Sequence, residues 1–180
     1  ALRGRLLSFH DDPRSAGAQA ARYETDGVLL IVDGRIEAVG PYNAVSVPDD
    51  AVWDDLRPWL LTPGFIDAHI HFPQTQVIAS HGAQLLEWLE RYTFPAELRY
   101  GDPAHVERFA RFFIDTLLRH GTTTAVAYGS VHPQSVDGLF MEAERRGLRL
   151  IAGKVMMDRN APDGLRDTAQ RGYDESEAVS

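Results

Sequence analysis

The sequence predicts an α/β protein in which a small β segment precedes the first part of a larger α/β barrel. Two observations lead to this fold class. Residues 27–40 hold two apolar runs around an Asp-Gly pair, which is a strong signal for a β-hairpin. From about residue 61, stretches rich in β-branched residues alternate with amphipathic stretches at helical spacing. That alternation is the order of parallel βαβ units.

Residues 1–61 form the first predicted domain, a β segment at the N-terminal side of the chain. The hairpin of residues 27–40 belongs to it. Residues 8–26 are polar and contain glycine and proline, so we expect a loop there. A segment with so few strands can bury little core by itself. We therefore expect it to complete its sheet with strands that lie outside this chain.

Residues 62–180 form the second predicted domain, in which strands and helices alternate. Asp102 is a good N-cap for the longest helix, and Gly121 is a good residue to end it. Three parallel strands without a closing partner predict an incomplete barrel; a small, complete open sheet is the alternative. The predicted order is a strand over 64–71, helices over 84–92 and 102–121, a strand over 122–129, a helix over 135–147 and a strand over 148–158.

The composition limits the class of protein. Hydrophobic residues make up 44% and charged residues 24% of the 180 residues, and the formal net charge is -8. This acidic balance argues against nucleic acid or an anionic membrane as a partner. The chain contains no cysteine, so nitrogen and oxygen atoms would have to bind any metal. No apolar run approaches the roughly 20 residues that span a bilayer, and residues 1–15 lack a secretory signal, so we expect a cytoplasmic protein.

Two histidines, His69 and His71, stand one residue apart in the first predicted barrel strand. Alternate residues of a strand point to the same side, so Phe65 and Asp67 are expected on the histidine face. The two Cα atoms would lie about 6.5 Å apart, which allows both imidazoles to bind one ion. Barrel active sites lie at the C-terminal ends of the strands, where this pair is predicted. A metal, a hydrogen-bond network and chance are the three explanations for the pair.

Other ionisable residues offer weaker candidates. His132 and Asp158 each follow a predicted strand and could support a site, although a surface position is favoured for both. Three interpretations are open for Lys154. It could be a metal-bridging lysine modified by CO₂, a buried amine paired with a carboxylate, or a lysine whose aliphatic chain packs while its ammonium group reaches solvent. A structural role is favoured. The remaining histidines are expected in loops or on helix surfaces: His10, His81, His105 and His120.

Several longer stretches resemble a known family. They are PGFIDAHIH, HFPQ, LLEWLERYTFPAE, HGTTTAVAYGSVHPQSVDGLF and IAGKVMMDRNAPDGL. Together they resemble the guanine deaminases of the amidohydrolase superfamily, the bacterial type most closely, over residues 61 to about 170. The resemblance implies a distorted (β/α)8 TIM barrel with a β-sandwich built from both chain ends. It also implies hydrolytic deamination of guanine to xanthine and ammonia in purine catabolism.

The resemblance assigns roles to individual residues as well. It implies one Zn2+ per subunit, held by His69 and His71 together with later ligands, and iron is possible because imidazole suits both metals. Guanine would be the small-molecule substrate, bound by His71, Gln74, Leu85 and Trp88. The proton-transferring residues would lie beyond Ser180, so no catalytic residue is assigned in this chain. The resemblance further implies a homodimer, and no nucleic acid or membrane is expected as a partner.

Three alternatives stay open at the level of sequence. The chain could belong to another metal-dependent amidohydrolase that acts on a cyclic amide or an aminated heterocycle. It could be a metal-free relative that uses the barrel as a scaffold, or an interaction module made from a shortened gene. Lys154 lies on the third predicted strand, whereas the bridging lysine of binuclear relatives belongs to the fourth. That difference favours one metal over two.

Overall fold

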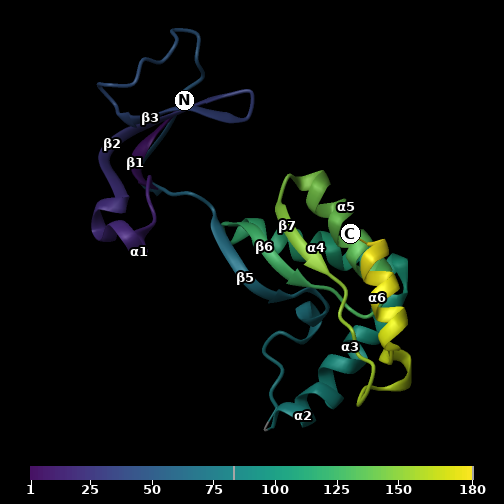
Figure 1. Ribbon diagram of the computed structural model, residues 1–180. Coiled ribbons are helices and arrows are strands. Elements are labelled where there is room, and N and C mark those ends of the chain that lie inside the picture. The colour runs from purple at the N-terminus through teal and green to yellow at the C-terminus, as the bar shows by residue number, and fades with distance from the viewer. Residues whose placement is uncertain (83, 180) are drawn as a thin grey trace. The chain divides into compact units, whose positions relative to one another are not determined.

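The computed structural model describes residues 1–82 and 84–179. The chain divides into two compact units, Ala1–Pro63 and Gly64–Ser180. Figure 1 colours them from purple through yellow along the chain. Each unit has its own sheet, and the two sheets are described separately below.

The first unit is a four-stranded sheet with strand order β3-β2-β1-β4. Strand β1 pairs antiparallel with β2 and parallel with β4, and β2 pairs antiparallel with β3. Asp33 and Gly34 both have positive φ angles, 50° and 74°, as a type I′ hairpin turn requires. The predicted hairpin is therefore confirmed. The strands are β1 (Leu2–Phe9), β2 (Ala21–Val32), β3 (Arg35–Pro41) and β4 (Asp54–Leu61).

The prediction of a loop over residues 8–26 is wrong at both ends. Strand β1 runs to Phe9, and β2 already begins at Ala21, where Tyr23 pairs with Leu7 of β1. Pairing with a distant strand extends β2 through a polar stretch whose local sequence favours a loop. Two short helical turns occupy the middle, α1 (Pro13–Ala16) and η1 (Gly17–Ala20). The unit therefore contains more strand than predicted, around a small core of Leu6, Ala20, Val28 and Leu30.

The second unit contains a three-stranded parallel sheet in the order β5-β6-β7. This arrangement confirms the predicted α/β class. The third strand is shorter than predicted, because it ends at Gly153 and Lys154 already leaves the sheet. The strands are β5 (Phe65–His71), β6 (Thr122–Tyr128) and β7 (Arg149–Gly153).

Two long helices, α4 (Pro103–Arg119) and α5 (Pro133–Arg146), pack against each other and against β6 and β7 (Figure 1). The Asp102 carboxylate accepts a hydrogen bond from the backbone N–H of Ala104 at 3.0 Å, which confirms the predicted N-cap. Gly121 has a φ of +83°, which ends the α4 turn as predicted. The core between helices and sheet includes Phe72, Tyr100, Val106, Ala110, Phe113, Ile114, Leu117, Ala125, Leu139 and Ala143.

Shorter helical segments surround this core. The predicted helix over 84–92 extends further, as α2 (Leu85–Trp88), a π-helical turn η3 (Leu89–Thr93) and α3 (Phe94–Leu98). Helix α6 (Ala169–Ala178) was not predicted, because it buries only Gly172 and shows no apolar stripe. No helix within the described residues is long and apolar enough to cross a bilayer. The remaining turns are η2 (Phe72–Val77), η4 (Arg99–Gly101) and η5 (Asp163–Leu165).

Candidate metal and substrate site

The carboxyl ends of the three parallel strands meet at one edge of the sheet in the second unit. His71 pairs with Tyr128, and Tyr128 pairs with Gly153, so the last residues of β5, β6 and β7 are neighbours in register. Ligand sites of α/β barrels form at this edge, from strand ends and the loops that follow them. The predicted residues His69, His71 and Gln74 all lie at this edge, at the end of β5 or just after it.

The His69 and His71 rings point toward each other, with their Nε2 atoms 3.3 Å apart. Two nitrogens bound to one tetrahedral zinc ion, each at about 2.0–2.1 Å, would be separated by about 3.3–3.4 Å. The pair therefore fits a shared metal ion without a change of geometry. The same separation also permits an N–H···N hydrogen bond between the rings when no ion is bound, which keeps the hydrogen-bond explanation compatible with the metal one.

Burial and a neighbouring imidazole both favour the neutral form of His71. Burial lowers the pKa of the His71 imidazole, and the nearby His69 ring lowers that pKa further. A neutral imidazole has a free lone pair, which is the form that binds a metal. Among residues 1–82 and 84–179, no three His, Cys, Asp or Glu side chains gather around one point. The pair thus supplies two donors, and a zinc site needs further ones.

A bulge in β5 changes the predicted face of Asp67. The pairing with β6 shifts between Asp67 and Ile70, so β5 carries one more residue than β6 there. Asp67 and Ile70 each pair with a residue on the same buried face of β6, so Asp67 lies on a different side from His71. The predicted unbroken alternation is wrong here. The Asp67 carboxylate accepts a hydrogen bond from the backbone N–H of His69 at 3.1 Å, and so stabilises the bulge.

Tyr128 is a residue of this site that the sequence reasoning missed. Its ring stacks on the His71 ring, with centroids 4.7 Å apart and planes inclined by 17°. It also contacts the His69 ring, at a centroid distance of 5.1 Å. One aromatic side chain therefore limits the rotation of both imidazoles. Its position as the last residue of a strand parallel to the histidine strand was the signal that could have found it.

A cavity of about 410 Å³ opens beside the histidine pair. Gln74 and Trp88, two predicted substrate-binding residues, line it together with His69 and His71. The indole N–H of Trp88 donates a hydrogen bond to the carbonyl of Ser80 at 3.2 Å, which fixes the orientation of the ring. Leu85 is 69% exposed and is not part of the cavity wall. The apolar part of that wall comes instead from Ile70, Val77, Ile78, Phe113 and Leu117.

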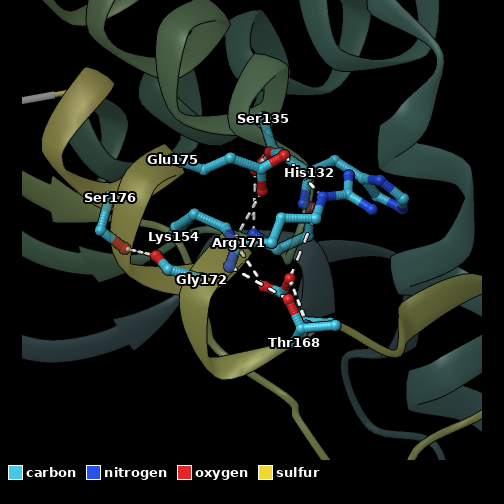
Figure 2. Close-up of polar contacts among 10 residues, drawn as sticks. His132, Ser135, Lys154, Thr168, Arg171, Gly172, Glu175 and Ser176 are labelled. Atoms are coloured by element: carbon cyan, nitrogen blue, oxygen red, sulfur yellow. Dashed lines mark hydrogen bonds and ion pairs between the residues drawn. The ribbon is translucent and has the colours of Figure 1, made fainter.

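Lys154 lies just after β7, fully buried, with its ammonium group between two carboxylates (Figure 2). Its Nζ atom is 2.6 Å from Oδ2 of Asp167 and 2.8 Å from Oε2 of Glu175. The interpretation of Lys154 as an amine paired with a carboxylate is therefore confirmed. Asp158 is exposed, as predicted. His132 is half-buried as the N-cap residue of α5, and burial lowers the pKa of its ring.

The prediction that His105 lies on a helix surface is wrong. Its side chain is buried, and its Nε2 atom lies 2.9 Å from Nε2 of Gln76. The side-chain carbonyl of Gln76 accepts a hydrogen bond from the Arg99 guanidinium at 2.9 Å, so the side-chain amide nitrogen of Gln76 must be the donor to His105. This chain of hydrogen bonds ties η2, the segment that carries Gln74, to α4. A polar residue in the first turn of a helix, one position before the predicted apolar stripe begins at Val106, gave no sequence signal for such burial.

Comparisons with known proteins place this geometry in a family context. The model of the amidohydrolase family matches residues 60–179. The guanine deaminase of Escherichia coli (strain K12) is 49% identical over 184 residues, which cover 99% of this chain and 42% of that protein. The probable guanine deaminase of Deinococcus radiodurans is 42% identical over 86% of this chain and 37% of its own length. The chain thus spans about two fifths of the length of these curated relatives.

Solved structures resemble the chain over the same extent. The structure of E. coli guanine deaminase has a TM-score of 0.90 and 46% identity, and the match covers 99% of this chain and 42% of that one. A guanine deaminase from C. acetobutylicum with bound guanine in its active site has a TM-score of 0.81 and 26% identity, over 99% of this chain and 41% of that one. The α/β units described above are therefore part of an amidohydrolase fold.

Proposed function

Since the chain belongs to the amidohydrolase family, we propose that the full-length protein catalyses the hydrolytic deamination of guanine to xanthine and ammonia. In this reaction a C–O bond forms at carbon 2 of the purine, and the C–N bond to the exocyclic amine breaks. Water supplies the oxygen, and the leaving nitrogen departs as ammonia. The reaction needs an activated water, a wall that holds the flat base, and polar groups that recognise its edge.

The described residues supply part of the first need, the second need, and part of the third. His69 and His71 would hold one zinc ion, because their Nε2 atoms already lie 3.3 Å apart at one point of the cavity. When bound, zinc lowers the pKa of water to about 7 and so provides a nucleophile at neutral pH. Gln74 lines the same cavity, and its carboxamide can both donate and accept along a purine edge. Trp88 offers an aromatic face for the base.

One observation carries the proposal: two imidazole nitrogens converge at zinc-ligand separation on the wall of a cavity that also contains Gln74 and Trp88. Similarity to guanine deaminases over 99% of the chain supports guanine as the substrate. We also propose that residues 1–61 belong to a β-sandwich and residues 62–180 to a (β/α)8 barrel. The homodimer, the cytoplasmic location and the role in purine catabolism stay predictions.

The substitution His69→Ala tests the proposal in the full-length protein. We expect the variant to lose bound zinc, measured by elemental analysis, and to lose guanine turnover, measured as xanthine formed. His10→Ala is the matched control, because His10 is exposed and lies in the other unit. A panel of purines, pyrimidines and cyclic amides would separate guanine from other substrates of this family. If His69→Ala kept both its zinc and its turnover, the assignment would be wrong.

A further inference from the structure

Four charged side chains gather where the chain leaves β7, and the proposed chemistry uses none of them. Lys154 has no exposed side-chain surface, and Asp167 has only 3%. Lys154 donates a hydrogen bond to Asp167 at 2.6 Å. Glu175 lies 2.8 Å from the Lys154 nitrogen through one oxygen and accepts from Arg171 at 2.7 Å through the other. Figure 2 shows the Lys154 side chain reaching toward Glu175 and Arg171 of helix α6.

A buried ion cluster of this kind costs desolvation energy, so its presence calls for an explanation. Replacement by apolar residues of similar volume is often neutral or stabilising, whereas removal of one partner leaves an uncompensated charge. A role in specifying one arrangement of the segments that it joins is one reason for a protein to keep such a cluster.

Lys154 lies at the point where the chain leaves the sheet. It follows Gly153, which pairs with Tyr128, and Tyr128 in turn stacks on His71. The next residue, Val155, donates its backbone N–H to the carbonyl of Ser130 at 3.0 Å. The segment 155–166 therefore starts at the edge of the sheet that carries the candidate metal site.

The same segment is closed at its base. The backbone N–H of Asp167 donates to the carbonyl of Met157 at 2.8 Å, while the Asp167 carboxylate binds Lys154 and the N–H of Thr168. Leu165, near the end of the segment, is fully buried. Lys154, the first residue after β7, is thus joined to Asp167, which lies just before the N-cap residue of α6, and to Glu175 within that helix.

We propose that Lys154, Asp167 and Glu175 form a latch that holds segment 155–166 in one conformation where it leaves the sheet edge that carries the candidate site, and that Lys154 is a positioning residue for substrate binding. The inference rests on the proposed function for its link to guanine. It assigns Lys154 no contact with the metal, since its nitrogen is engaged by two carboxylates. Without the lysine, the buried carboxylate of Asp167 would lose its cation and repel the partly buried carboxylate of Glu175, and we expect the base of the segment to open.

Lys154→Met in the metal-loaded, full-length protein tests the latch, because methionine keeps the length of the stem and removes the charge. We expect amide hydrogen exchange at Val155 and Asp167 to become about 10-fold faster or more, since both N–H groups are hydrogen-bonded at the base. We expect KM for guanine to rise about 10-fold with kcat within about threefold, which is the signature of lost binding. Zinc stoichiometry should not change.

Arg166→Gln is the matched control, because Arg166 lies in the same segment and pairs only at the surface with Asp163. This variant should change neither the rate of amide hydrogen exchange at Val155 and Asp167 nor the KM for guanine. If Lys154→Met does not fold, Glu175→Gln is the milder variant, because it keeps the Lys154–Asp167 pair. In this variant, amide hydrogen exchange at Val155 and Asp167 should become about threefold faster, and KM for guanine should rise about threefold. Unchanged exchange in the variant that folds would overturn the latch. Faster exchange with unchanged KM would overturn its role in binding.

The two proposals can fail separately. A wild-type protein that binds zinc but does not convert guanine would contradict the proposed function. The exchange measurement would still decide the latch in that case, because it requires no substrate. Conversely, a Lys154→Met variant that converts guanine with the wild-type KM and shows wild-type amide hydrogen exchange would support the proposed function and contradict the latch.

Discussion

Tyr128→Ala is expected to weaken metal binding by the histidine pair. The Tyr128 ring contacts both imidazoles, with centroid distances of 4.7 and 5.1 Å. These contacts hold the rings in the metal-binding orientation before an ion arrives, and each aromatic pair is worth about 0.5–1.5 kcal/mol beyond its buried area. The cost of orienting the freed rings when zinc binds is therefore at most about 1–3 kcal/mol. Because Tyr128 is 42% exposed, we expect the lower part of that range. About 1–2 kcal/mol corresponds to a loss of roughly 5- to 30-fold in zinc affinity.

The measurement is zinc affinity by competition with a chromophoric chelator, in the full-length protein at neutral pH. This readout is independent of turnover, so it reports on the metal site and not on the chemical step. Tyr128→Phe is the control, since it keeps the ring and removes only the hydroxyl, and its affinity should stay within about twofold of wild type. A Tyr128→Ala variant with unchanged affinity would refute the reasoning, and so would an equal loss in both variants.

Two further predictions concern stability. Burial raises the pKa of Glu97 to about 7 from an ordinary value of 4.5. The native state then binds more protons than the unfolded chain between those values, so stability falls as pH rises through this range. The substitution Glu97→Gln should remove this pH dependence and raise the free energy of unfolding by up to about 3 kcal/mol above pH 7. Urea unfolding at pH 5 and pH 8 measures the effect. A pH dependence as steep as that of the wild type would contradict the prediction. Ile114 is fully buried in the core, so Ile114→Ala should lower the free energy of unfolding by about 2–5 kcal/mol. Phe112 lies on the same helix but is 55% exposed, so Phe112→Ala should lower it by about 0.5 kcal/mol or less in the same urea experiment. Equal costs would show that the core is placed wrongly.

Local patterns in the sequence were enough for most elements of the second unit. The Asp102 cap, the Gly121 end and the apolar stripe of α4 all act within a few residues, so their signals are readable without a structure. The strand that carries His69 and His71 was predicted, with both histidines near its C-terminal end. Helix α6 gave no such signal, because only Gly172 within it is buried.

Within the site, the sequence determined which residues could bind, and the tertiary structure decided which of them meet. The spacing of the two histidines predicts that their rings share a face, and Nε2 atoms 3.3 Å apart agree with it. The cavity then includes Gln74 and Trp88 and leaves Leu85 in solvent. Helical spacing alone predicts that Leu85 and Trp88 lie on the same face of the helix. Only the packing of that helix decides that Trp88 lines the cavity and Leu85 does not.

The remaining features depend on contacts between residues far apart in the chain. Tyr128 reaches the histidines because β6 pairs with β5, the bulge at Asp67 arises from that pairing, and Lys154 is buried because Asp167 and Glu175 return to it. Periodicity and capping are local properties of a sequence, so they can be read residue by residue. Strand register and the partners of buried charges depend on how distant segments pack, and only the folded chain settles them.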